Sequence, residues 1–165
     1  MKEPSLGRSL IDALKEGASG EVVVERAGLR ARARVAGAGL YGSELEGLTV
    51  ETETRGLGGR PARTERVVHG LAERLDYLGE PLEALEITPS HGRGQLRTRR
   101  DRVRDGEYFE LDVQDGDRVD VGRVRYDREA GERRKQTRNT GHGVLRRLVD
   151  DLAELIDNAD SPTQD

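Results

Sequence analysis

The most chemically suggestive part of the chain is a basic segment, 133–142, that leads into a strongly amphipathic stretch near the C-terminus. The amphipathic stretch predicts a helix, and the unpaired N–H groups at a helix N-terminus favour anions. Cationic and hydroxyl side chains just ahead of that helix would complete a phosphate or carboxylate site. The expected anion-binding residues are Arg134, Lys135, Arg138, Thr140 and His142, with Thr140 also expected as the N-cap.

A second arginine-rich run would extend this basic patch if its strand lies nearby. Its members are Arg97, Arg99, Arg100, Arg102 and Arg104. Together they would suit a nucleic-acid binder. However, the chain carries a net charge of −4, and it has four Tyr, one Phe and no Trp, so aromatic side chains for base stacking are scarce. The alternative is a solvated strand edge whose charges pair locally.

The amphipathic stretch 143–157 carries a broad apolar stripe. Such a helix usually packs on its own sheet, but part of the stripe can instead be buried against a second copy or another protein. Under that second interpretation, the expected partner-binding residues are Val144, Leu148, Leu152 and Leu155.

Two motifs match ligand-binding patterns but fail the test of context. The segment 37–42, Gly-Ala-Gly-Leu-Tyr-Gly, has the spacing of a dinucleotide-binding loop, yet a strand pattern rather than a helix follows it. Four aspartates surround Gly116, but this glycine is at position five of the motif, where a calcium loop requires it at position six. The sequence therefore predicts an inter-strand loop and a hairpin turn at these places. The aspartates are Asp112, Asp115, Asp117 and Asp120.

Metal and covalent chemistry have little support in the sequence. There is no cysteine, and His69, His91 and His142 are far apart and form no metal-binding pattern. We expect no metal and no cofactor. An enzyme remains an alternative only if carboxylates meet in a cleft, and the acids that would do so are Glu51, Glu53, Glu110 and Asp112.

These residues must be positioned by elements that the periodicity of the sequence predicts. Apolar positions at helical spacing predict helices over 5–15, 61–78 and 143–157. Alternating patterns predict strands over 21–25, 27–35, 48–54, 82–88, 95–103, 107–114 and 118–126, with a polar edge strand over 132–138. Asp115-Gly116 predicts a tight hairpin, because this turn needs positive φ at its centre.

The predicted fold class is α+β: an antiparallel sheet of six to seven strands with helices mainly on one face, in the order α-βββ-α-ββββ-α. We expect a single domain over 1–158 and a polar, flexible tail over 159–165. There is no apolar run of the length that a signal peptide or a membrane span needs, which predicts a cytoplasmic protein without membrane contact.

The order of helix, three strands, helix, strands and helix is similar to that of class I type III secretion chaperones. These are small acidic dimers that bind unfolded segments of client proteins, and the resemblance covers the order of elements over most of the chain. It implies a dimer that binds a protein segment.

The leading functional hypothesis is a small non-catalytic protein–protein binding module, adaptor-like or chaperone-like and dimeric. It rests on the apolar stripe of 143–157 and on the lack of a catalytic constellation. The alternatives are a phosphate or nucleic-acid binder that uses 133–142 and an enzyme with a carboxylate site.

Overall fold

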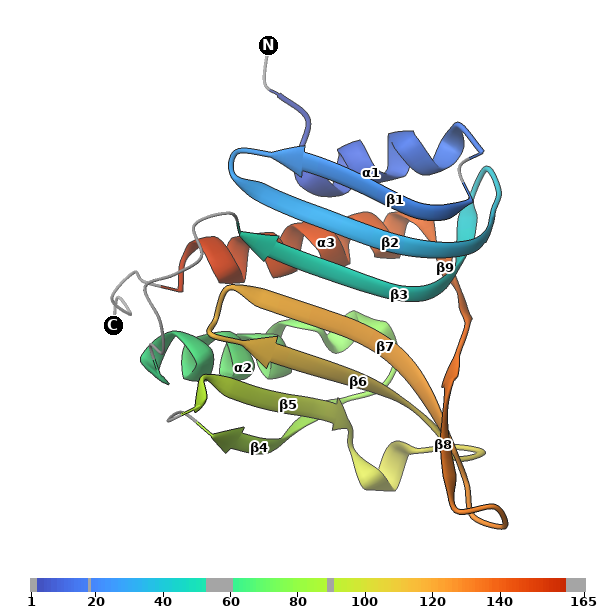
Figure 1. Cartoon of the computed structure of the whole chain (residues 1–165), viewed down its shortest axis with the longest axis vertical. Helices are drawn as coiled ribbons and strands as arrows, with labels where there is room; N and C mark the ends of the chain where they lie inside the picture. The colour runs from blue at the N-terminus through green and yellow to red at the C-terminus, as the bar shows by residue number, and fades with distance from the viewer. Residues whose placement is uncertain (1–2, 18, 53–60, 89–90, 160–165) are drawn as a thin grey trace.

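The structure is a computed structural model that describes residues 3–17, 19–52, 61–88 and 91–159 of the 165-residue chain. Within these ranges the chain forms one antiparallel sheet of nine strands and three α-helices (Figure 1). The predicted α+β class with an antiparallel sheet is therefore confirmed, whereas the sheet has more strands than the six to seven expected. None of the described helices is long and apolar enough to cross a membrane.

Two antiparallel meanders make up most of the sheet. The first contains β1 (Gly20–Arg26), β2 (Leu29–Ala38) and β3 (Gly42–Thr52). The second contains β4 (Leu82–Thr88), β5 (Arg93–Thr98), β6 (Glu107–Gln114) and β7 (Arg118–Asp127). The spatial order is β1-β2-β3-β7-β6-β5-β4, so β3 and β7 join the meanders. At this joint, residues 48–51 of β3 pair with residues 118–121 of β7.

The last two strands come from the segment that was predicted to be a single edge strand. It divides into β8 (Glu132–Gln136), which pairs with β7, and β9 (Arg138–Gly141), which pairs with β3. This division arises because β3 and β7 diverge beyond their joint. Each of them then takes a separate partner from the returning chain, as the right side of Figure 1 shows.

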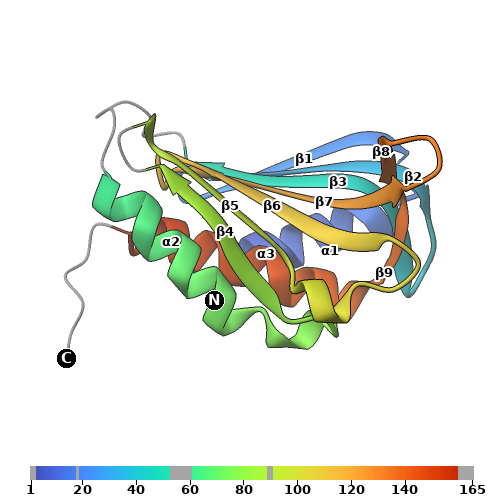
Figure 2. The ribbon, with the colours of Figure 1, turned by 90° about the horizontal axis from the view of Figure 1, so that it is seen from below.

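Three α-helices cover one face of the sheet and leave the other face open (Figure 2). They are α1 (Leu6–Lys15), α2 (Pro61–Arg74) and α3 (His142–Asp157). The side chain of Ser5 caps α1 by accepting the N–H of Arg8 at 3.1 Å. After α2, a short 3-10 turn, η1 (Asp76–Leu78), ends at Gly79 in the left-handed conformation that glycine favours.

Helix α3 lies between α1 and α2 and packs against β3, so it forms the centre of the helical layer. Alternate residues of the strands point toward it and are buried, as the period of two requires. The largest fully buried side chains are Leu10, Leu14, Val50, Val67, Val68, Leu71, Leu75, Leu96, Leu111, Leu145, Leu152 and Ile156.

Local turns follow the sequence closely, with one exception. Asp115 and Gly116 have φ of 55° and 69°, which confirms the predicted hairpin between β6 and β7. The strand predicted over 95–103 ends earlier: β5 stops at Thr98, and a 3-10 turn, η3 (Arg100–Arg102), follows. Four consecutive charged residues, 99–102, occupy this stretch, so no apolar alternation holds it in the sheet.

The segment 37–42 spans the end of β2, the short connection 39–41 and the first residue of β3. The strand β3, and no helix, follows it, as the sequence indicated. At the other end of the chain, Ala159 is buried, and its carbonyl accepts a hydrogen bond from Arg66 at 2.8 Å. The rest of the predicted tail, 160–165, lies outside the described residues.

Candidate binding surface

The five predicted anion-binding residues do not converge on one site. Arg134 and Lys135 lie on β8, Arg138 and Thr140 lie on β9, and His142 begins α3. Because β8 follows β7 while β9 crosses to β3, the segment spreads these side chains over two strand pairs. Of this set, only Arg134 lines the large hollow described below.

Three of these residues have structural partners at the joint between β9 and α3. The N-cap of α3 is Gly141 and not Thr140, because the chain stays extended and paired with β3 through Gly141. His142 is buried, and its Nε2 lies 2.9 Å from Oγ of Ser43. The guanidinium of Arg138 lies over the ring of Phe109, 4.5 Å from its centroid. The predicted anion site at the start of α3 is thus occupied by internal contacts.

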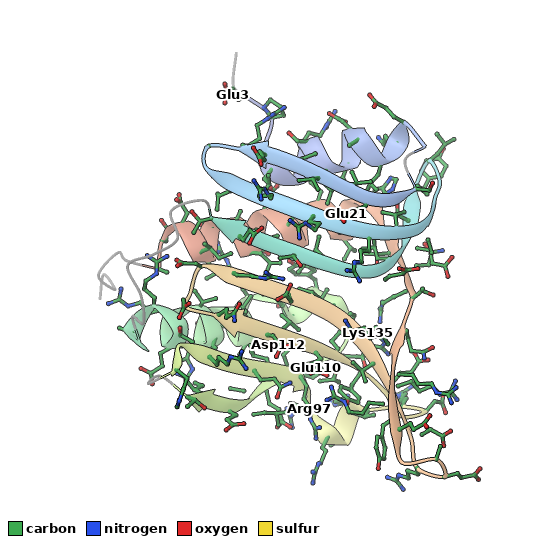
Figure 3. The ribbon with its side chains drawn as sticks, viewed as in Figure 1. Glu3, Glu21, Arg97, Glu110, Asp112 and Lys135 are labelled. Atoms are coloured by element: carbon green, nitrogen blue, oxygen red, sulfur yellow. The ribbon has the colours of Figure 1, made fainter. Side chains whose placement is uncertain are left out.

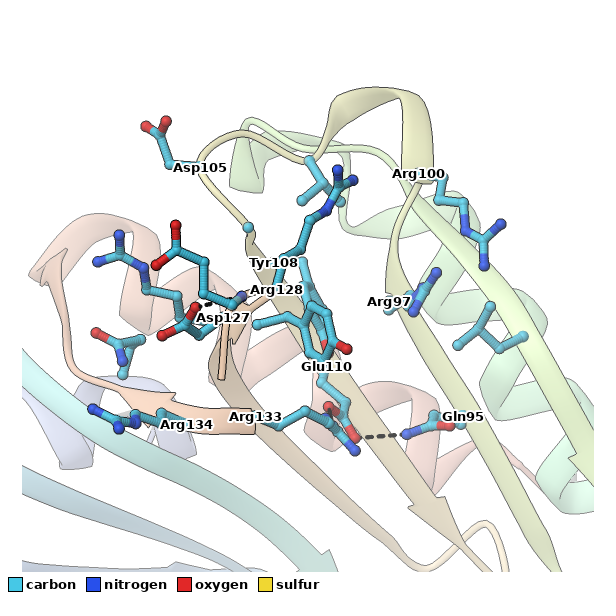
Figure 4. A pocket seen from close by; sticks show the side chains of 17 residues that line it. Gln95, Arg97, Arg100, Asp105, Tyr108, Glu110, Asp127, Arg128, Arg133 and Arg134 are labelled. Atoms are coloured by element: carbon cyan, nitrogen blue, oxygen red, sulfur yellow. Dashed lines mark hydrogen bonds and ion pairs between the residues drawn. The ribbon is translucent and has the colours of Figure 1, made fainter. Parts of the chain in front are cut away.

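A broad hollow of about 1190 Å³ opens on the face of the sheet that the helices leave uncovered. Residues of β5 and β6, η3 and the β7–β8 hairpin surround it (Figure 4). We call it the arginine hollow, since six arginines line it. They are Arg97, Arg100, Arg125, Arg128, Arg133 and Arg134.

The positive charge of the arginine hollow is only partly compensated. Arg133 pairs with Glu110, and the Glu110 carboxylate raises the pKa of Arg133. Arg134 pairs with Glu132 at 3.0 Å. Among the described residues, the other four guanidinium groups have no ion-pair partner; they belong to Arg97, Arg100, Arg125 and Arg128.

Two tyrosines lie among these arginines. Tyr108 is buried beneath the guanidinium of Arg97, which lies 5.5 Å from the ring centroid. Tyr126 forms part of the wall and is 42% exposed, and Leu85 on the opposite side is 45% exposed. The hollow therefore offers apolar and aromatic surface next to uncompensated cations.

Of the second arginine run, Arg97 and Arg100 line the hollow together with Arg134, whereas Arg99, Arg102 and Arg104 do not. The tyrosines and Leu85 were not predicted, because no local pattern shows which exposed apolar residues lie beside the arginines.

Four acids also line the hollow: Asp105, Glu110, Asp127 and Glu129. Two of them have internal partners. Glu110 binds Arg133 and accepts a hydrogen bond from Gln95 at 2.6 Å, while Asp127 accepts the N–H groups of Glu129 and Ala130 in the hairpin turn. The mixed rim still leaves six arginines against four acids.

A row of carboxylates continues along the open face beside the hollow, and Figure 3 shows Glu110 and Asp112 there together with Arg97. Asp112 lies directly opposite Asp120 in the β6–β7 ladder. Partial burial raises the pKa of Asp112, and the charges of Glu110 and Asp120 raise it further. Asp120 is held by Thr49 at 2.5 Å and Arg118 at 3.1 Å.

Of the other two acids of the enzyme hypothesis, only Glu51 lies among the described residues, and it pairs elsewhere. Glu51 lies on β3, where its carboxylate is 3.8 Å from Arg30 and 3.9 Å from Arg32. Opposite charges on neighbouring strands, as in these contacts between β2 and β3, stabilise strand pairing modestly. Glu53 lies outside the described residues. Of the acids named for catalysis, only Glu110 and Asp112 therefore lie together.

No metal site is visible in the described ranges, where no three or more His, Cys, Asp or Glu side chains are placed to hold an ion. His69 lies on α2, His91 precedes β5, and His142 is bonded to Ser43. Asp117, from the predicted turn, pairs with Arg63 of α2.

The predicted partner-binding stripe of α3 is used largely inside the chain. Leu148 is 5% exposed and Leu152 is fully buried, because α3 is enclosed by α1, α2 and the sheet. Leu155 is half-buried and packs against the core. Of the four, Val144 is the most exposed, at 40%.

A second, smaller cavity of about 150 Å³ lies where β3 and β7 diverge, and we call it the fork cavity. It is bordered by β9, by the first turns of α3 and by η1. Its apolar lining is Leu45, Leu48, Leu78, Phe109, Val121, Val144 and Leu148. Arg123 and Arg138 also line it.

These features define a class of protein: an antiparallel α+β fold with three helices on one face of the sheet and an arginine-lined hollow on the other. Comparisons with protein-family models, with curated proteins and with solved structures find no match to this chain. The similarity to class I type III secretion chaperones therefore rests on the order of helices and strands alone.

Proposed function

We propose that the protein is a non-catalytic protein-binding module whose arginine hollow receives an acidic segment of a partner. The observation that carries this proposal is the group of four guanidiniums around one hollow that lack an ion-pair partner within the described chain. A carboxylate bound in the hollow would give these guanidiniums the ion-pair partner that the described chain does not supply. Guanidinium groups also match carboxylates in a bidentate geometry.

The composition of the hollow favours a protein over a nucleic acid. Tyrosine and arginine are the side chains enriched at the energetic centres of protein interfaces. Asp105, Asp127 and Glu129 line the same hollow, and a protein segment can present backbone N–H groups or basic side chains to them, which a uniformly anionic phosphate backbone does not. The net charge of −4 for the whole chain disfavours a long polyanion more than a short segment with a few carboxylates, because the long-range repulsion grows with the charge of the ligand.

The experiment compares three fluorescent probes by anisotropy at low and moderate salt. They are a short peptide alternating Glu and Leu, the same peptide with Lys in place of Glu, and single-stranded oligothymidine. We expect the acidic peptide to bind most tightly and its affinity to fall as salt screens the arginines.

Charge reversal at the hollow provides the matched variant. Arg125→Glu together with Arg128→Glu should weaken binding of the acidic peptide about tenfold or more, because each arginine changes from attraction to repulsion. The control is Arg26→Glu together with Arg146→Glu, which changes the net charge equally at two exposed positions outside the hollow. Equal binding by both double variants would overturn the proposal, and preferential binding of oligothymidine would replace it with the nucleic-acid alternative.

We further propose that the module is a dimer, as expected from the sequence. Light scattering on the unmodified protein tests this independently of the peptide experiment. If the protein is a monomer at all concentrations and still binds the acidic peptide, the dimer is excluded and the proposed binding function is kept.

A further inference from the structure

The fork cavity has the size and the walls of a site for one small apolar group. Its volume of about 150 Å³ equals that of an engineered protein cavity that takes up benzene. Leu45, Leu48 and Leu148 provide aliphatic walls, and the ring of Phe109 provides an aromatic one. A planar ring or a branched aliphatic group would replace the lost dispersion contacts of these walls.

The topology explains why the cavity is there. The pairing of β3 with β7 ends at Leu48 and Val121, and β9 pairs only with residues 42–45 of β3. Between these pairings the sheet is open, and Gly47 and Gly122 line the opening. A Cβ atom at Gly122 would meet nothing within 4 Å, so no neighbouring group fills that side.

Two guanidinium groups lie at this apolar site. Those of Arg123 and Arg138 are 4.7 and 4.5 Å from the ring centroid of Phe109. Glu80 contacts both of them, at 3.5 Å from Arg138, and Glu107 is 3.6 Å from Arg123. Neither Glu80 nor Glu107 lines the cavity; the acid that does is Glu46, which is exposed.

Glu80 and Glu107 balance the charges of Arg123 and Arg138, but of these four residues only the two arginines line the cavity. Burial lowers the pKa of Arg138 and the charge of Arg123 lowers it further, which outweighs the attraction of Glu80 and Glu107. A carboxylate beside this guanidinium would stabilise its charged form in a partly desolvated place, where ion pairs are stronger than in water.

From the cavity and its cations, we infer that the fork cavity binds a small apolar group that carries a carboxylate. Its apolar part lies on Phe109 among the leucines, and its carboxylate meets Arg138. The site is separate from the arginine hollow, with which it shares no lining residue, so it does not depend on the proposed protein-binding function.

The test uses 3-phenylpropionate and the matched neutral alcohol, 3-phenylpropanol, and follows backbone amide shifts by NMR together with calorimetry. We expect both compounds to shift amides of β3, β9 and the first turn of α3. The acid should bind about tenfold more tightly than the alcohol, since a hydrogen bond to an ionised carboxylate is stronger than one to a neutral hydroxyl.

Variants separate the two parts of the site. Arg138→Gln should reduce the affinity for the acid to that for the alcohol, and Arg138→Lys should keep most of the preference for the acid. Leu148→Phe fills the cavity and should block both compounds. Arg134→Gln, in the arginine hollow, is the control and should leave both affinities unchanged.

Three outcomes would overturn the inference: no binding of either compound, equal affinities for the acid and the alcohol, or amide shifts confined to the arginine hollow. If binding is observed, N-acetyl-Gly-Phe with a free carboxylate distinguishes two sources of the ligand. Tighter binding than 3-phenylpropionate indicates a peptide C-terminus, and weaker binding indicates a free acid. Failure of the acidic peptide at the arginine hollow would not affect these results.

Discussion

The buried hydroxyl of Ser43 lies 2.9 Å from Nε2 of His142 and joins the start of β3 to the start of α3 across 99 residues of sequence. The other ring nitrogen, Nδ1, lies 3.2 Å from the carbonyl oxygen of Leu40. A neutral ring with its proton on Nδ1 donates to Leu40 and accepts from Ser43, so both nitrogens are satisfied. This contact fixes the β2–β3 connection against the central helix.

Ser43→Ala should lower the free energy of unfolding by about 1–3 kcal/mol, because it leaves Nε2 of His142 buried without a donor. Urea denaturation measures the loss. In a double-mutant cycle with His142→Phe, the two effects should be non-additive by about 1 kcal/mol. Thr137→Ala removes an exposed hydrogen bond to Glu44 and is the control. Strict additivity would show that the two side chains do not stabilise each other.

Gly7→Ala should destabilise the contact between α1 and α3. The N–H of Gly7 donates to Oδ1 of Asp150 at 2.8 Å, and a methyl group at Gly7 would meet the Arg146 carbonyl oxygen as well as that carboxylate. We expect a net loss of about 1–3 kcal/mol in urea denaturation, even though alanine favours helices. Gly143→Ala in α3, where a Cβ meets nothing within 4 Å, should be neutral or stabilising. A stabilising Gly7→Ala would mean that the helices do not approach this closely.

Gly116→Ala should destabilise the protein more than a glycine-to-alanine change in another turn. Gly116 has φ of 69°, and its added Cβ would also meet the backbone of Arg63 in α2. Gly131→Ala, at φ of 64° with nothing within 4 Å, carries only the backbone penalty of about 1–2 kcal/mol. Thermal unfolding of both variants compares the losses. Equal losses of stability would show that the β6–β7 turn does not contact α2 closely.

Asp112→Asn should stabilise the protein at neutral pH by roughly 0.5 kcal/mol, since Asp112 faces Asp120 directly across the ladder. The folded pKa of Asp112 is raised above its ordinary value of 3.8. Ionisation of Asp112 therefore lowers the stability of the protein as the pH rises from 3.8 through the higher pKa of the folded state. The gain from the variant should disappear below that interval, where the carboxyl is protonated in both states. Urea midpoints measured across pH check this, and a gain that is independent of pH would contradict the charge argument.

Local structure follows closely from local sequence in this protein. The periods of two and of 3.6 residues placed β4 and β6 at their observed bounds and α1 and α3 within one residue at each end. Asp115-Gly116 identified its turn because positive φ is a property of the two residues themselves. These features depend on neighbours in the chain, which is why the sequence reveals them.

The binding surfaces depend on contacts that no local pattern contains. The segment divides into β8 and β9 because β3 and β7 diverge. The pattern of residues 132–141 does not indicate this divergence. Similarly, the stripe of α3 has the same pattern whether a partner or the chain itself covers it, and here α1, α2 and the sheet cover most of it.

The sequence by itself determined the class of fold, most helices and strands, and the presence of many arginines among acids. Tertiary structure alone decided which arginines lie together: Arg97 and Arg100 come from one part of the chain and Arg125 and Arg128 from another, yet they line one hollow. It also decided that Arg138 lies on Phe109 instead of joining them. The physical reason is that strand pairing brings distant residues into register, and this pairing is set by the whole sheet rather than by any segment of it.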